Sequence, residues 1–309
     1  MLTFDKLKLV TSINDIEIID ENQFNVTYQN GIITSMKFYQ DLPFLLMIKI
    51  DYVCNEVVIE FTGKVLKSDY SKLISVQTIK QCFDNINDMG FCLLDVEGIM
   101  THAQVVECDV TRDVTDLDVS QLSAYIGSNL SSYRHYQCRT LRNGNLIIEK
   151  NVTTKKLMKR ITIYDKDREM RRSSNMKFAE KYGVMDDFKG VCRFEMNLNS
   201  KEQIRSALGV SDTGLMSVLS SDANPILDYL KEVISPPEIM QVKDKKTYIS
   251  MLVLKDNDYD LAKVEAKMRE FHPRGTSIGK VMETYRAVLA QTTEADAGSQ
   301  YQNLISSLS

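Results

Sequence analysis

Alternating apolar and polar residues over the first seventy positions predict β-structure. The segments QFNVTYQ and ITSMKFY flank Asn30-Gly31, a residue pair that favours the left-handed turn of a two-residue hairpin. The segments FLLMIKIDYV and EVVIEFTG flank Cys54-Asn55 and predict a second hairpin. Residues 1–70 are therefore expected to form an N-terminal β-rich part.

From residue 71 onward, strand patterns and helix patterns alternate. Apolar residues at helical spacing predict a helix over 75–89, with Ile79, Cys82 and Phe83 on its buried face. Further strands are expected at 104–114, 145–150, 159–165 and 190–198, and further helices at 118–130, 166–181 and 200–208. This mixed order predicts an α+β fold, with a predominantly antiparallel sheet and helices packed on one face.

Strand signals become sparse beyond about residue 210. The stretch 211–309 is expected to be a mostly helical C-terminal region, except for the β-like segment KTYISMLVL at 246–254. Pro236-Pro237 interrupts the chain just before that segment. The predicted organisation is thus a β-rich part (1–70), a core (71–210) whose sheet can reach back to about residue 43, and the C-terminal region.

The composition is that of a soluble globular protein, with 43% hydrophobic and 26% charged residues. No apolar run approaches the roughly 18 residues of a membrane helix, and MLTFDKLKLV does not resemble a secretory signal, so a cytoplasmic location is expected. The six cysteines form no C-x-x-C pair and the three histidines are isolated. Any bound metal is therefore expected on oxygen ligands.

The charge is unevenly distributed along the chain. The net charge is −4, but residues 131–193 hold sixteen Lys and Arg against seven Asp and Glu, whereas residues 1–60 hold four against nine. A basic middle in an acidic chain is typical of a local site for a polyanion. Solvated surface lysines are the alternative explanation.

The parity of three predicted strands places polar side chains together. In QVVECDVTRDV, the acids Glu107, Asp109 and Asp113 alternate with apolar residues; VCRFEMNL and RITIYDK place Glu195 and Tyr164 opposite their apolar faces. If these strands share a sheet, one face carries several carboxylates and a phenol. Such acids repel one another unless a cation or basic residues neutralise them, although a half-solvated antiparallel sheet also has a polar face.

The order and spacing of ECDVTRDV, RITIYDKDRE and CRFEMNL resemble the rolling-circle replication initiators of small plasmids and filamentous phages, the Rep-trans and gene II type. The resemblance covers roughly residues 50–210, and VVIEFTGKVL adds Glu60 as a weaker member. The chain departs from the family in lacking a basic residue before Asp109 and the glycine-containing segment before the tyrosine strand.

The resemblance implies specific roles for the polar residues. Tyr164 corresponds to the nucleophile that nicks DNA, with Lys166 and Glu169 as its catalytic neighbours. Asp109, Asp113 and Glu195 correspond to carboxylates that hold Mg²⁺ or Mn²⁺. The expected product is a 5′-phosphotyrosyl bond and a free 3′-OH, from which the same site can rejoin the strand.

The implied partner is DNA, either the single-stranded form or a hairpin at an origin, in the cytoplasm of a bacterial host; a host helicase is a further possible partner. The basic residues expected to contact DNA are Arg134, Arg139, Lys155, Lys156, Lys159, Arg160, Arg168, Arg171 and Arg172.

The leading hypothesis is a nickase that initiates rolling-circle replication of a plasmid or phage. A relaxase of a mobile element would use the same site, and a non-catalytic nucleic-acid-binding protein could share the basic surface. A structural protein of a virus particle is the third alternative, although no sequence feature calls for it. The oligomeric state is left open by the sequence.

Overall fold

The computed structural model describes residues 2–115, 117–129, 136–142, 144–150, 159–234, 244–257, 261–271, 278–292 and 303–309. It divides into two compact units, the first comprising 1–233 with 308–309 and the second 234–307. The sequence placed boundaries near 70 and 210, whereas strands from both sides of residue 70 share one sheet and the units divide after residue 233.

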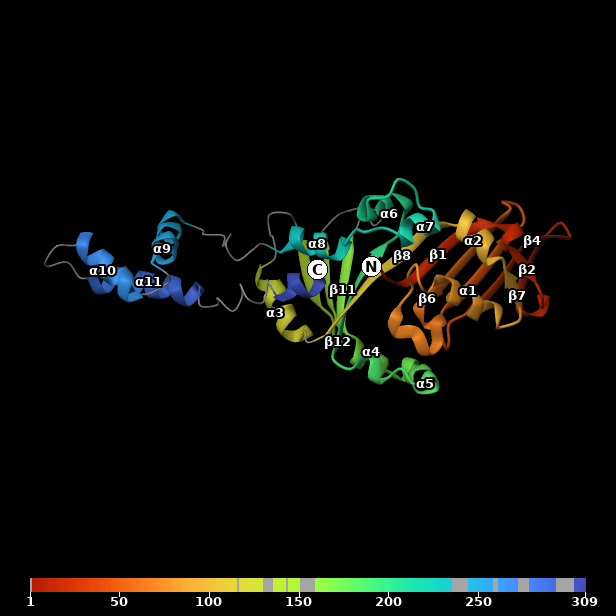
Figure 1. Cartoon of the computed structure of the whole chain (residues 1–309), viewed down its shortest axis with the longest axis horizontal. Coiled ribbons are helices and arrows are strands. Elements are labelled where there is room, and N and C mark those ends of the chain that lie inside the picture. Colours follow the sequence, from red (N-terminus) through yellow and green to blue (C-terminus); the bar gives the residue numbers. More distant parts are fainter. Residues whose placement is uncertain are drawn as a thin grey trace. The chain divides into compact units, whose positions relative to one another are not determined.

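A ten-stranded antiparallel sheet forms the frame of the first unit (Figure 1), in the order β3-β4-β5-β6-β1-β8-β12-β11-β10-β9. Its strands are β1 (Phe4–Ser12), β3 (Asn25–Gln29), β4 (Ile32–Gln40), β5 (Leu46–Asp51), β6 (Glu56–Thr62), β8 (Gln104–Thr115), β9 (Tyr136–Thr140), β10 (Leu146–Lys150), β11 (Arg160–Asp165) and β12 (Val191–Leu198). A small second sheet pairs β2 (Ile16–Ile18) with β7 (Cys92–Leu94). The predicted α+β class with a predominantly antiparallel sheet is confirmed.

Helices separate the strands and cover the sheet. In the first unit they are α1 (Ile79–Asn87), α2 (Val96–His102), α3 (Val119–Asn129), α4 (Lys166–Met170), α5 (Ser173–Tyr182), α6 (Lys201–Leu208), α7 (Leu215–Leu219) and α8 (Pro225–Val233). The 3₁₀ segments include η3 (Gly63–Lys72) and η6 (Asp186–Phe188).

The apolar face of the sheet forms the core. Alternate strand residues such as Leu7, Cys108 and Phe194 are fully buried there. Helix α1 packs Phe83 edge-on against Phe61 of β6, and α6 and α8 contact β8 and β12. Because side chains alternate along a strand, burying this face forces the polar residues of β8, β11 and β12 onto the other face.

Elements outside the sheet cover one end of the opposite, polar face. Tyr70 of η3 packs against Phe178 of α5 and Phe188 of η6, and it hydrogen-bonds to Asp5 of β1. Helix α4 directly follows β11 and contacts β12. These elements convert one end of the polar face into a buried site.

Most local predictions agree with the structure. The hairpins β3–β4 and β5–β6 form, with Asn30, Gly31 and Asn55 at positive φ as the turns require. The helix predicted over 166–181 is divided into α4 and α5, because Arg172 is extended (φ −68°, ψ 147°).

The β-like segment at 246–254 was predicted wrongly and lies in a helix, α9 (Lys245–Asp256). Its β-branched residues suggested a strand, but Asp244 accepts hydrogen bonds from the backbone and hydroxyl of Thr247 and caps a helix. Ser250 and Leu254, four residues apart, are the buried positions, which is a helical spacing.

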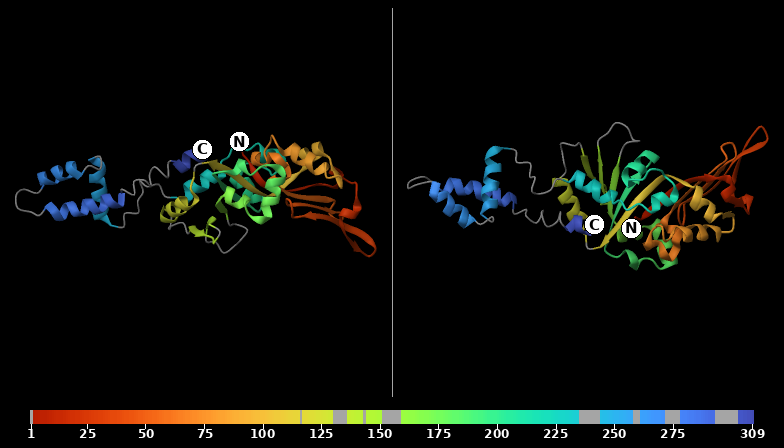
Figure 2. Two further views of the ribbon diagram at one scale, coloured as in Figure 1. Left: turned by 90° about the horizontal axis from the view of Figure 1, so that it is seen from below. Right: turned by 45° about the horizontal axis from the view of Figure 1, so that its top comes forward.

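The second unit contains α9, α10 (Leu261–Phe271) and α11 (Ile278–Thr292), which pack on one another (Figure 2). Its buried cluster comprises Leu254, Val264, Met282, Tyr285 and Val288. The expectation of a mostly helical C-terminal region is confirmed for the described residues. None of the helices in the described ranges has the length and apolarity needed to cross a membrane.

Candidate functional site

The register of three strands aligns the polar residues in rows across the sheet. Arg193 of β12 lies between Asp113 of β8 and Tyr164 of β11. Glu195, two residues further along β12, lies opposite Thr111, and the next row joins Asn197 with Asp109. The predicted polar face therefore exists, and it brings together residues that are 31 to 88 positions apart in the chain.

Tyr164 donates a hydrogen bond from its phenol to Oε1 of Glu195. The two residues are diagonal neighbours on adjacent strands, a separation that a tyrosine side chain can bridge. Tyr164 is only 7% exposed. Its pKa is raised well above the usual value by burial and by the charge of Glu195, so the resting phenol carries its proton.

Glu195 is suited to accept that proton. Burial, and secondarily Asp5, raises the pKa of its carboxyl to about 7, against the opposing effects of Arg193 and Lys166. A carboxylate with a pKa near neutral is an effective general base. The pair therefore joins a protonated phenol to a carboxyl group whose pKa lies near neutral.

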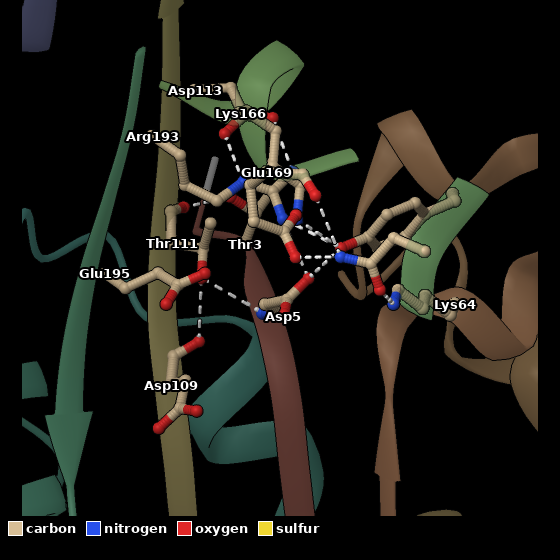
Figure 3. Close-up of polar contacts among 12 residues, drawn as sticks. Thr3, Asp5, Lys64, Asp109, Thr111, Asp113, Lys166, Glu169, Arg193 and Glu195 are labelled. Atoms are coloured by element: carbon tan, nitrogen blue, oxygen red, sulfur yellow. Dashed lines mark hydrogen bonds and ion pairs between the residues drawn. The ribbon is translucent and has the colours of Figure 1, made fainter. Parts of the chain in front are cut away.

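Arg193 lies at the centre of a buried charge cluster (Figure 3), and its side chain is fully buried. Its Nε and Nη2 contact the two carboxylate oxygens of Asp113 at 2.6 and 2.7 Å. Its Nη1 donates to Asp5 at 2.9 Å and to the Tyr70 hydroxyl at 3.1 Å. The two carboxylates neutralise the guanidinium and accept its hydrogen bonds, and this offsets the cost of burying its charge.

Lys166 lies at the start of α4 and is also buried. Its ammonium donates to the Tyr70 hydroxyl and to Glu169, each at 2.8 Å, and lies 5.6 Å from the centre of the Tyr164 ring. Burial and Arg193 oppose its charge, but Tyr70, Asp5 and Glu169 outweigh them and raise its pKa. Lys166 is therefore a cation that adjoins the ring face of Tyr164 and is oriented by Glu169.

The Lys166 cluster extends to α5. Asn175 hydrogen-bonds to the backbone and carboxylate of Glu169, and Lys64 of η3 donates to Asn175 at 2.6 Å. Burial lowers the pKa of Lys64. These contacts join η3, α4 and α5 around Lys166, which lies over the ring of Tyr164.

Further along the polar face, lysine side chains lie between the acidic side chains. Lys8 of β1 lies 3.6 Å from Glu60 and 3.4 Å from Glu107, and Lys6 lies 3.6 Å from Glu60 and 4.0 Å from Asp109. Burial raises the pKa of Asp109 despite Lys6. The acidic face is therefore neutralised largely by basic residues of the chain itself.

The three predicted metal ligands do not converge in this arrangement. Asp109 and Asp113 are four residues apart on one strand, about 13 Å along it, and lie at opposite ends of the group in Figure 3. Asp113 is held by Arg193, and Asp109 accepts a hydrogen bond from Asn197 at 2.7 Å. Within the described ranges, no three His, Cys, Asp or Glu side chains form a group able to hold a metal ion. The set of three does not fit one ion, and Asp109, whose described partners are Lys6 and Asn197, is the candidate oxygen ligand that remains.

The predicted DNA-contacting residues are only partly described. Arg134, Lys155 and Lys156 lie outside the described residues. Arg139 pairs with Glu149 on β10. Arg160 donates to Asn197 on the polar face, which places it one row from Glu195.

The remaining predicted DNA-contacting residues flank β11 in sequence, one before the strand and three after it. Lys159 precedes the strand, and Arg168, Arg171 and Arg172 are exposed on or beside α4 and α5. Arg171 contacts Asp167 at 2.9 Å. Exposed cations therefore lie in sequence on both sides of Tyr164.

Five residues of the polar face and its cover were not singled out as site residues from the sequence. The alternation in FDKLKLV could have placed Lys6 and Lys8 on the polar face. The position of Asp5 could not be predicted in this way, because the strand register shifts between Phe4 and Lys6. Tyr70 lies in an irregular 3₁₀ segment, where no periodicity indicates its contacts. Arg193 was placed on the correct face, but its pairing with Asp113 depends on strand register.

Comparisons of the chain with protein families, with curated proteins and with solved structures found no match. The function is therefore argued from the site alone.

Proposed function

We propose that the protein is a DNA nicking and joining enzyme that initiates rolling-circle replication of a plasmid or phage. The observation that carries the proposal is the hydrogen bond from the Tyr164 phenol to Glu195, whose carboxyl pKa is about 7. Sequence order adds support, since the tyrosine strand and the acidic strands occur as in the replication initiators that the chain resembles. A relaxase acting on a transfer origin would use the same chemistry.

In the proposed reaction, the phenol oxygen of Tyr164 attacks a DNA phosphorus in line with the 3′ oxygen. Glu195 takes the phenol proton as the new O–P bond forms. The P–O3′ bond breaks, and the 3′ oxygen takes a proton from solvent to give a 3′-OH. The 5′ phosphate is then linked to Tyr164, and attack by a 3′-OH in the reverse direction rejoins the strand.

Lys166 has a supporting role in this scheme. Its ammonium, held by Glu169, adds positive charge beside the ring of Tyr164 as the phosphate becomes more negative. Since Tyr164 is 7% exposed and Lys166 of α4 lies over its ring, the DNA phosphate reaches it only if neighbouring segments move. The exposed Arg168, Arg171 and Arg172 lie on α4 or between α4 and α5 and would attract the strand.

Dependence on Mg²⁺ or Mn²⁺ stays a prediction of the family resemblance. Asp109 would help to hold such an ion, which would draw charge from the phosphate oxygens, and Glu195 keeps its role as the base. Adding and chelating the ion in the nicking assay tests this part separately from the identity of the nucleophile.

The decisive experiment replaces Tyr164 by Phe and measures covalent protein–DNA adducts on an origin-containing single strand, with Mn²⁺ and with chelator. Tyr164→Phe should abolish the adduct while DNA binding is retained, because only the phenol oxygen is removed. Tyr182→Phe is a matched control outside the cluster and should form the wild-type amount. Adducts that persist in Tyr164→Phe would refute the assignment, and peptide mapping would show whether Tyr70 is the nucleophile instead.

A non-catalytic DNA-binding protein is the second candidate. It is favoured by the burial of Tyr164, by the raised pKa of its phenol and by the pairing of Asp113 with Arg193. This alternative predicts that the wild-type protein binds the strand but forms no adduct with either metal ion. The same assay therefore separates the two functions.

A further inference from the structure

The second unit contains a basic hollow that the proposed nicking site does not use. The hollow has a volume of about 590 Å³ and is formed by α9 and α11. Three of its lining residues are lysines, Lys245 and Lys246 at the start of α9 and Lys280 near the start of α11. This volume lies within the range of about 300–1,000 Å³ that is typical of ligand sites.

Among the described acids, Asp244 adjoins these lysines: hydrogen bonds from Thr247, and to a smaller extent the charge of Lys246, lower the pKa of its carboxyl. No ion pair joins Lys245, Lys246 or Lys280 to a described carboxylate, and all three are exposed. On α10, by contrast, Lys267 pairs with Glu270 at 2.8 Å and Arg269 with Glu265 at 2.6 Å.

The charged residues that line the hollow are three lysines, and no acid is among the lining residues. Residues 234–307 hold ten basic and ten acidic residues, so the stretch as a whole is neutral. Three like charges that share one hollow repel one another, and a bound anion relieves that repulsion. The lining therefore favours a negatively charged ligand over a neutral or positive one.

Two hydroxyl groups and an apolar wall complete the hollow. Ser250 is 5% exposed yet lines it, and Thr284 lines it from α11. No described residue forms a side-chain hydrogen bond with the Ser250 hydroxyl, which leaves it available to a phosphate oxygen. Ile249 and Val281 provide apolar surface against which the sugar of a nucleotide can lie.

We propose that this hollow binds the phosphate backbone of a single DNA strand, as a second contact separate from the nicking site. The choice of DNA among polyanions rests on the proposed function, whereas the preference for phosphate rests on the lysines and hydroxyls. Lysine ammonium groups act as point charges, so the contact holds the strand irrespective of its sequence.

The test uses the full-length protein and a fluorescently labelled single strand of mixed sequence, with affinity measured by anisotropy over a range of salt concentrations. The triple variant Lys245→Ala, Lys246→Ala, Lys280→Ala should bind more weakly by roughly 10- to 100-fold near 0.1 M salt. Its salt slope should fall by about 2, since each neutralised phosphate of a single strand contributes about 0.7. The matched control, Lys263→Ala, Lys267→Ala, Arg269→Ala, removes the same charge from α10 and should bind like wild type.

Equal affinity and slope in the two triple variants would overturn the proposal. It would also be overturned if the hollow variant lost binding of inorganic phosphate, followed by calorimetry, but kept its affinity for the strand, because the ligand would then be a small anion. Neither result depends on adduct formation. If Tyr164→Phe forms no adduct and the two triple variants bind the strand equally, the nicking function is supported and only the second contact is rejected.

Discussion

Replacing Arg193 by Met removes the charge on which the buried cluster depends. The methionine fills a similar volume but cannot satisfy Asp113 and Asp5, which contact the guanidinium at 2.6 to 2.9 Å. Both acids would then remain in a poorly solvated site without their cation. The protein is expected to fold with markedly lower stability.

The structure sets the size of this effect. Breaking a buried ion pair by removing one partner costs about 3–5 kcal/mol. The side chains of Asp5 and Asp113 are 19% and 22% exposed, so water relieves part of that cost and the lower end, about 3 kcal/mol, applies. For a unit of this size, about 3 kcal/mol lowers the melting temperature by roughly 6–12 °C.

Thermal and urea unfolding, followed by circular dichroism and tyrosine fluorescence, measure this loss. Arg171→Met is the matched control, since Arg171 pairs with Asp167 at 2.9 Å on the exposed side of α4. It should cost less than about 0.5 kcal/mol, as surface ion pairs do. Adding Asp113→Asn to Arg193→Met should recover about 1 kcal/mol or more, because one of the uncompensated charges is removed. A loss no greater than that of Arg171→Met would refute the idea that the cluster holds the polar face together.

Two further outcomes follow from the pKa directions. Adduct formation should rise with pH through a midpoint near 7, because Glu195, with a pKa of about 7, must lose its proton before it can accept that of Tyr164. In Glu195→Gln, rates measured over the same pH range should be lower by about 10²- to 10⁴-fold and should show no midpoint near 7. A midpoint that is unchanged in this variant would belong to another group. Arg193 and Lys166 outweigh burial and lower the pKa of Asp5 below its unfolded value, so its contribution to stability is complete above about pH 4 and is lost as the pH falls through the folded pKa. Urea midpoints measured from pH 7 to pH 3 should therefore fall less steeply for Asp5→Asn than for the wild type, and parallel curves would contradict this assignment.

The sequence by itself determined the fold class and which residues share the polar face. Alternation in β11 and β12, and in β8 apart from Val105 and Arg112, favours one assignment of faces once one side is buried, so Tyr164, Arg193 and Glu195 were placed correctly. The hairpins were equally predictable, because Asn30-Gly31 and Asn55 fit positive φ at low cost.

Only the tertiary structure decided which of these residues meet. Strand register pairs Asp113 with Arg193 and leaves Glu195 to Tyr164, and register depends on partners that are distant in sequence. Parity indicates a face but not a position along it, so it could not show that Asp109 and Asp113 lie about 13 Å apart. The contact between Tyr70 and Lys166 depends on where the irregular segment η3 folds back, which no local periodicity encodes.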